Sequence, residues 1–269
     1  MDRIIQQSAT AETDNRISLL NTQVDVLTMP ELISITDRYI QNRQPLHIVG
    51  VNADKINQMY QDEALRQVVN RCGIIHADGI SIVLASRFLK KPLPERIAGI
   101  DLMERLTQQS AEKGYSIFLL GAAQQVVEQT RKALLEQYPG LRIVGIHNGY
   151  FQEEDWPQIS RILAEANPHL VFVGITSPQK EHIIAYLQQE GHQCVFMGVG
   201  GSFDVLSGEK RRAPLWLRRI GMEWLFRLIQ EPKRLMKRYL VGNILFLYAV
   251  CREKLSQIQQ RKLYDKTEN

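Results

Sequence analysis

The chain has 269 residues, of which 44% are hydrophobic and 23% charged, which is ordinary for a folded protein of one large domain or two modest ones. Its three cysteines show no paired metal-ligand spacing and are too few for a disulfide framework, which argues against a disulfide-rich secreted domain and favours a reducing compartment. The first residues lack the basic segment, apolar core and cleavage site of a secretion signal, so we expect residues 1–16 to form a flexible lead-in.

The net charge of +4 is unevenly distributed along the chain. Between Glu209 and Arg238, ten Lys or Arg residues stand against three acids, a local balance of +7 that leaves −3 for the remainder. This asymmetry indicates an anionic partner at that end, either nucleic acid, a phosphorylated ligand or an anionic membrane surface. The alternative is a helix face that is simply solvated, which is the commoner reason for an isolated run of charge.

Short β-rich runs alternate with longer segments of helical periodicity, a pattern typical of a mostly parallel sheet covered by helices. In chain order we predict a strand at Leu46–Val51, a helix at Ala53–Val69, a strand at Gly73–His76, helices at Ile80–Leu89 and Asp101–Lys113, a strand at Tyr115–Leu120, a helix at Ala123–Tyr138, a strand at Leu141–Ile146, a helix at Trp156–Ala166, a strand at Leu170–Ile175, a helix at Gln179–Gln189 and a strand at Cys194–Val199. Ligands of such sheets bind at the carboxyl ends of the strands.

After Gly208 the chain becomes helical, basic and aromatic. Its most apolar stretch, YLVGNILFLYAV, has twelve residues, whereas a transmembrane helix needs about 20. An Arg-rich amphipathic helix with Trp and Phe can instead lie in the membrane interface. Packing of these aromatics against the α/β layer is the alternative. The final stretch, QQRKLYDKTEN, is predicted to fray.

Asp78 follows a buried apolar run and precedes Gly79 and a new helical segment. An aspartate in this position often caps the helix by accepting a backbone N–H. A carboxylate at a strand end can also act as a general base that takes a proton from an attacking hydroxyl. The sequence by itself leaves both interpretations open.

Three glycines and an aspartate follow the last predicted strand, in the stretch MGVGGSFD. The glycines are Gly198, Gly200 and Gly201. Glycines let the backbone approach a ligand and leave N–H groups free for phosphate, and the carboxylate of Asp204 suits a pair of ribose hydroxyls. In HNGYF, Gly149 marks a turn and Tyr150 could stack on a nucleobase or lie in the core. Each signal is weak by itself.

The sequence contains no usual metal-binding motif. Its six histidines form no close pair, and H-E-x-x-H, C-x-x-C and Asp-x-Asp are absent. We therefore expect no metal and no other cofactor. A bound diphosphate would then need side-chain cations, and the planar fork of arginine suits phosphate oxygens.

Seven motifs together resemble the WecG/TagA/CpsF family of bacterial glycosyltransferases, sequence family 26. They are, in order, VNADKI, HADGIS, PERIAGIDLMERL, GYF, SPQKE, GVGGSFDVLSGEKRRAP and GMEWLFRLIQEPKRLMKRYLVGN. The resemblance runs from about Ile17 to Phe246, and the last two motifs are long and specific.

The resemblance implies an inverting transferase that moves a sugar from a UDP-sugar to an undecaprenyl-diphosphate-linked saccharide in surface-polysaccharide synthesis. It implies a Rossmann-like core at residues 17–208 and a helical appendage at 209–269 that completes the site and contacts the cytoplasmic face of the plasma membrane. Self-association into a homo-oligomer is compatible with this. We expect no nucleic-acid partner, because no nucleic-acid module is recognisable.

The family pattern also implies roles for individual residues. They are Asp78 as catalytic base with Asn52 and Arg96 near it; Gly149, Tyr150, Gly198, Gly200, Gly201 and Asp204 in the nucleotide crevice; Gln179 and Lys180 at the donor sugar; and Arg96, Arg227, Arg234 and Lys237 at diphosphate. In this mechanism the acceptor hydroxyl attacks the anomeric carbon while Asp78 takes its proton, and UDP leaves.

The chain departs from the family pattern at three places. Gly50 stands where members often carry a hydroxyl residue, and the usual Lys-Gln pair is reversed to Gln179-Lys180. Lys237 stands where arginine is frequent, which keeps the charge but loses the fork. The donor therefore stays open among N-acetylmannosamine, its uronic acid and glucose.

Two other classes of protein share parts of this pattern. A nucleotide-dependent oxidoreductase would have the α/β core, but the G-x-G-x-x-G turn that it requires is not found. A non-catalytic nucleotide-binding, membrane-associated module would keep the glycines and arginines without needing Asp78. UDP binding without transfer would favour that module.

Overall fold

The computed structural model describes residues 15–267, apart from the side chains of residues 234, 238 and 262–267, so most of the predicted lead-in, residues 1–14, lies outside the described residues. Its centre is a six-stranded sheet in the order β4-β3-β8-β7-β5-β6, with every neighbouring pair parallel. The strands are β3 (Leu46–Val51), β4 (Ile74–Ala77), β5 (Ser116–Gly121), β6 (Arg142–His147), β7 (Leu170–Gly174) and β8 (Val195–Gly198). The predicted α/β class is confirmed.

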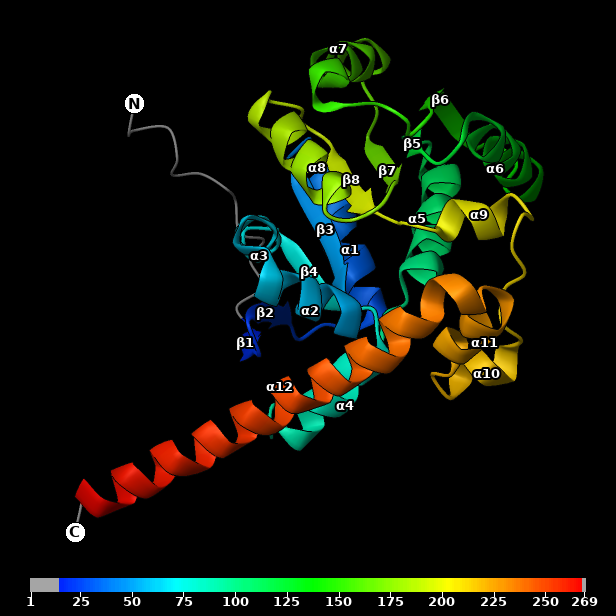
Figure 1. Cartoon of the computed structure of the whole chain (residues 1–269). Helices are drawn as coiled ribbons and strands as arrows, with labels where there is room; N and C mark the ends of the chain where they lie inside the picture. The colour runs from blue at the N-terminus through cyan, green and yellow to red at the C-terminus, as the bar shows by residue number, and fades with distance from the viewer. Residues whose placement is uncertain (1–14, 268–269) are drawn as a thin grey trace.

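Helices cover both faces of the sheet (Figure 1). One face carries α1 (Met29–Gln41), α5 (Gly99–Lys113), α6 (Gln124–Gln137) and the short α9 (Ser202–Leu206). The other carries α2 (Ala53–Gln61), α3 (Glu63–Asn70), α7 (Trp156–Ala166), preceded by the 3-10 turn η1 (Glu153–Asp155), and α8 (Gln179–Gln189). Burial on both faces explains why the central strands read as continuous apolar runs.

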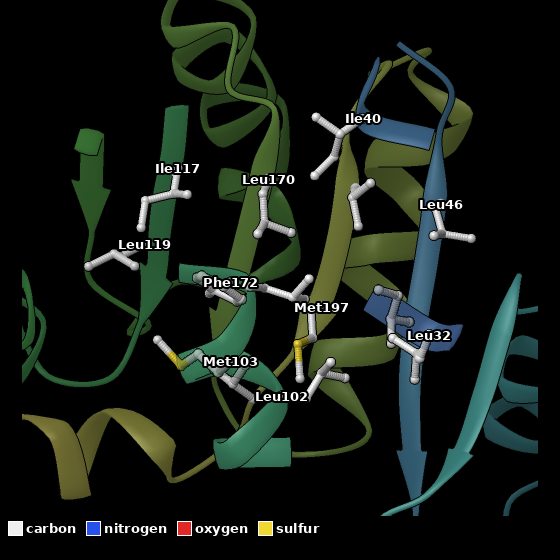
Figure 2. Packing of buried hydrophobic residues seen from close by; sticks show 14 of the residues in the cluster. Leu32, Ile40, Leu46, Leu102, Met103, Ile117, Leu119, Leu170, Phe172 and Met197 are labelled. Carbon is white, nitrogen blue, oxygen red and sulfur yellow. The ribbon is translucent and has the colours of Figure 1, made fainter. Parts of the chain in front are cut away.

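Alternation along each strand divides the core into two layers, because successive side chains point to opposite faces. Leu170 and Phe172 of β7 join the layer beneath α1 and α5, whereas Val171 and Val173 join the layer beneath α7 and α8. Figure 2 shows the first layer, in which Phe172 and the neighbouring Met197 of β8 lie among side chains of the flanking helices.

Several elements differ from the sequence-based predictions. The chain begins with an unpredicted hairpin, β1 (Arg16–Leu19) and β2 (Thr22–Asp25), and α1 was also unpredicted. The single helix predicted at Ala53–Val69 is two helices. The break is at Asp62, whose extended backbone ends α2 and whose side chain accepts the N–H of Leu65 at 2.9 Å, capping α3.

The C-terminal segment contains α10 (Leu215–Arg219), α11 (Glu223–Gln230) and α12 (Pro232–Thr267). Helix α12 continues to Thr267, into the stretch predicted to fray, and it extends well past the sheet (Figure 1). It packs along α2, where Asn57 Nδ2 donates to Gly242 O at 2.7 Å, and buries Phe246 and Val250 against the core. Within residues 15–267, no helix is long and apolar enough to cross a bilayer.

Candidate active site

The polar residues that follow the strands meet at one edge of the sheet. Val51 of β3 pairs with Ala77 of β4 in parallel register, so the next residues, Asn52 and Asp78, stand side by side beyond the strands. Gly198 ends β8, and Gly149 follows β6 at the same edge. This is the edge at which open α/β sheets bind ligands.

Asp78 caps a helix, but not the helix that directly follows it in the chain. The next helix, α4 (Ile80–Phe88), has Gly79 at its N-cap and no side-chain cap. Asp78 Oδ1 instead accepts the N–H of Gly99, the first residue of α5, at 2.7 Å. One carboxylate oxygen is thereby fixed, and Asp78 as a residue is half-buried at the sheet edge.

Asn52 lies beside the second oxygen of this carboxylate. Its Oδ1 accepts the N–H of Lys55 at 3.0 Å and so caps α2. Because the carbonyl side of the amide is occupied, Nδ2 points the other way and lies 3.4 Å from Asp78 Oδ2. The cap therefore determines which end of the amide faces the carboxylate.

The surroundings keep Asp78 ionised. Burial raises the pKa of its carboxyl group, but His76, the Gly99 N–H, Arg96 and Arg227 together outweigh burial and hold the pKa below its usual range. Burial also lowers the pKa of His76, whose ring is therefore neutral at pH 7. With its pKa below the usual range, the Asp78 carboxylate is ionised at neutral pH and can accept a proton.

Gly50 makes room for this arrangement. A Cβ on Gly50 would lie 2.9 Å from Asp78 Cβ and 2.9 Å from Cε1 of His76, its partner in the β3–β4 register. The imidazole of His76 and the base of the Asp78 side chain thus occupy the space that a side chain at position 50 would need. The absence of a hydroxyl residue here follows from packing.

A carboxylate that the sequence analysis did not select, Glu223, joins two of the predicted arginines. Arg96 Nε donates to the backbone O of Asp78 at 2.8 Å, and Arg96 Nη2 lies 2.8 Å from Glu223 Oε2. Arg227 Nη2 lies 3.1 Å from the other oxygen, Glu223 Oε1. The i, i+4 spacing of Glu223 and Arg227 was the only sequence signal for this cluster.

The remaining predicted diphosphate residues are on α12. The side chain of Arg234 lies outside the described residues. Lys237 is exposed, and in the described part of the chain no hydrogen bond or ion pair joins it to Asp78. Their predicted roles stay predictions.

A second charged cluster joins α2 to the start of α8. Lys180 extends over Gly198, where a Cβ would lie 2.7 Å from the lysine stem, and its Nζ is 3.4 Å from Glu181 Oε1. The same oxygen accepts a hydrogen bond from Lys55 Nζ, which also lies 3.4 Å from Ser177 Oγ. Two ammonium groups thus share one buried carboxylate. Lys55 and Glu181 were not predicted, because buried charges in helices give no periodic signal.

The other predicted donor residues surround the same edge. Tyr150 is 81% exposed, so it is not a core residue. Gln179 Nε2 donates to Phe151 O at 3.0 Å and ties α8 to the loop after β6. Asp204 forms an ion pair with Lys210 at 2.7 Å, and Gly200 adopts a φ of +50° between Gly198 and Gly201. Among the described residues, no group of three or more acidic, His or Cys side chains is placed to hold a metal.

Comparison with known proteins defines the class. A model of the glycosyl transferase WecG/TagA/CpsF family matches residues 17–260. An N-acetylglucosaminyldiphosphoundecaprenol N-acetyl-beta-D-mannosaminyltransferase of Staphylococcus aureus strain MW2 is 33% identical over 251 residues, which cover 93% of this chain and 96% of the relative. The protein of the same name from strain MRSA252 is 32% identical with the same coverage. The chain is a glycosyltransferase and belongs to the WecG/TagA/CpsF family.

Proposed function

We propose that this protein transfers a sugar from a UDP-sugar to a saccharide linked to undecaprenyl diphosphate, with inversion at the anomeric carbon. The observation that carries the proposal is the Asp78 carboxylate, held ionised on a half-buried residue at the carboxyl edge of the sheet. The names of the S. aureus relatives support the lipid-linked acceptor and make N-acetylmannosamine the first donor to test. Its uronic acid and glucose are the other candidates.

Asp78 has the position and charge that a general base needs. In a single displacement the acceptor hydroxyl attacks the anomeric carbon, and its proton passes to Asp78 as the bond to UDP breaks. The Gly99 N–H holds one carboxylate oxygen at 2.7 Å, so the second oxygen, near Asn52, is the one that can receive the proton. Positioned acid–base groups typically contribute about a hundred- to ten-thousandfold in rate.

The two arginines near Asp78 differ in what they can do for the leaving diphosphate. The Arg96 side chain is 18% exposed and braces the Asp78 backbone, whereas Arg227 is 44% exposed and uses one nitrogen on Glu223. The other donors of Arg227 can therefore bind phosphate oxygens bidentately. Neutralising charge on the leaving group in this way needs no metal.

The C-terminal segment would bring the site to a lipid-linked acceptor at the cytoplasmic membrane face. Its helices expose large apolar side chains beside their basic residues. They include Leu215, Trp216 and Ile220 on or beside α10, Ile229 on α11 and Leu240, Ile244, Leu247 and Tyr248 on α12. Apolar burial combined with attraction to anionic lipid holds such helices in the interface.

The test is UDP release by the purified protein and by Asp78→Asn, with a panel of UDP-sugars and a short-chain polyprenyl-diphosphate saccharide. We expect acceptor-dependent release from one donor, and a loss of at least a hundredfold in kcat in Asp78→Asn while UDP affinity is kept. Equal rates in the two proteins would refute the role of Asp78. Binding of UDP without turnover of any pair would favour the non-catalytic module.

A further inference from the structure

Glu223 joins the C-terminal segment to the Asp78 loop, the two residues Asp78 and Gly79 between β4 and α4. It is the first residue of α11 and is 7% exposed, with each carboxylate oxygen on a different arginine. Burial raises the pKa of Glu223, but Arg227 and Arg96 outweigh it and lower the pKa, so the carboxylate is charged. A buried carboxylate that accepts from two cations fixes the orientation of both.

Glu223 is linked to the backbone of Asp78 through Arg96. The guanidinium of Arg96 spans from Glu223 to the Asp78 carbonyl, and Arg96 itself lies three residues before Gly99. Gly99 is the residue whose N–H holds Asp78 Oδ1. Arg96 therefore contacts the Asp78 backbone directly and is joined to the start of α5 through two intervening residues.

The turn before α11 packs against Ile80, the first residue of α4. Gly221 has a φ of +75°, and a Cβ there would lie 2.8 Å from Ile80 Cγ1, two residues after Asp78. Arg96 Nη1 also approaches Arg218 O at 3.5 Å. The Gly221 backbone thus packs closely on the Ile80 side chain, and Glu223 follows two residues later at the start of α11.

We propose that Glu223 is a positioning residue, which sets the Asp78 loop through Arg96 and directs the free donors of Arg227 toward a diphosphate. This inference rests on the proposed transfer reaction. Glu223 does not touch the reacting atoms; its effect passes through the two arginines. The groups that face Asp78 from the packed elements are His76 of β4, Asn52 after β3, the Gly99 N–H, Arg96 and Arg227.

The experiment compares Glu223→Gln, which keeps the shape and removes the charge, with Glu223→Asp, which keeps the charge and shortens the side chain. The matched control is Glu253→Gln, because Glu253 on α12 pairs with Lys91 at 3.8 Å and also joins the C-terminal segment to the core. Arg227→Ala and the double variant Glu223→Gln/Arg227→Ala complete a cycle. Readouts are kcat and KM, affinity for inorganic pyrophosphate, thermal stability, and hydrogen exchange of peptides covering residues 95–101.

We expect Glu223→Gln to lower kcat about tenfold to a hundredfold with little change in KM, as for other groups that orient a catalytic side chain. Pyrophosphate affinity should fall, exchange at residues 95–101 should accelerate, and Glu223→Asp should recover part of the loss. The double variant should lose less than the product of the two single losses. Glu253→Gln should leave kcat, KM, pyrophosphate affinity and hydrogen exchange unchanged. It should shift thermal stability about as much as Glu223→Gln does.

Three results would overturn the proposal. One is a Glu223→Gln variant whose kcat and hydrogen exchange match those of Glu253→Gln. Another is independent, multiplicative losses in the double variant. The third is an increase in pyrophosphate affinity, which would mean that Glu223 masks the arginines. Hydrogen exchange and pyrophosphate affinity need no turnover, so an inactive wild-type protein would count against the proposed function alone.

Discussion

Replacing Glu181 by glutamine should destabilise the fold strongly, although the two side chains have nearly the same shape. Glu181 is fully buried on α8 and shares one oxygen between Lys55 and Lys180, whose side chains are 7% and 11% exposed. Glutamine would leave the two ammonium groups facing each other without an anion. Removing one partner of a buried ion pair leaves an uncompensated charge in a poorly solvated place.

The magnitude follows from the pKa of the carboxyl group. Burial raises the pKa of Glu181, but Lys180, Lys55 and the Ser177 hydroxyl outweigh burial and lower it from 4.5 to about 2. That difference corresponds to about 3 kcal/mol, and breaking a buried pair typically costs about 3–5 kcal/mol. Burial and, to a smaller extent, the charge of Lys180 lower the pKa of Lys55 to about 8. Lys55 can therefore lose its proton in the variant, which limits the loss of stability. We expect Glu181→Gln to lower the free energy of unfolding by about 3 kcal/mol.

The effect should depend on pH in a defined direction. The pKa of Glu181 is lower in the folded chain than in the unfolded chain, so its stabilisation is present above about pH 4.5 and is lost as the pH falls toward 2. The difference in unfolding free energy between wild type and Glu181→Gln should therefore be largest near neutral pH and shrink below about pH 4.5.

Urea denaturation followed by circular dichroism at pH 7 and pH 3.5 measures both quantities. The control is Glu136→Gln, because Glu136 and Lys132 form an exposed pair 4.0 Å apart on α6. An exposed i, i+4 pair contributes about 0.5 kcal/mol or less. The reasoning would be refuted if the unfolding free energy of Glu181→Gln lay within about 1 kcal/mol of that of the control at pH 7. It would also be refuted if the loss of unfolding free energy relative to wild type were the same at pH 7 and pH 3.5.

Two further predictions concern packing at the site and the membrane surface. Gly50→Ser should lower the free energy of unfolding in urea by about 1–3 kcal/mol, because its Cβ would overlap Asp78 and His76. It should also lower kcat by displacing the Asp78 carboxylate, and an unchanged kcat would contradict the packing argument. Ile244→Glu should weaken binding to anionic vesicles about tenfold or more in a sedimentation assay, since Ile244 is 68% exposed and its burial in lipid is worth about 1.5–3 kcal/mol. Thermal stability should be unchanged. Ser256→Glu on the same helix adds the same charge at an exposed polar position and should weaken vesicle binding less than Ile244→Glu does; equal losses in both variants would point to charge alone.

Much of the core could be predicted because its signals are local. Strand β3 has the predicted bounds, and the other sheet strands lie within one or two residues of theirs, since buried parallel strands read as apolar runs between glycines and polar turns. Helix α1 was missed although it has a signal: Glu31 accepts the N–H of Thr28 at 2.7 Å, three residues apart, as in a capping box. The hairpin was missed because its two strands are short and partly polar.

The sequence by itself determined most of the sheet strands and their helices, the family and the polar residues at the strand ends, because periodicity, turn residues and motifs are properties of neighbouring residues. Only the tertiary structure decided what those residues do to one another. Asp78 caps a helix that begins 21 residues later, and Glu223 meets Arg96 across 127 residues. Such contacts depend on how the helices pack on the sheet, and no local pattern of residue types encodes the distance between two side chains brought together in this way.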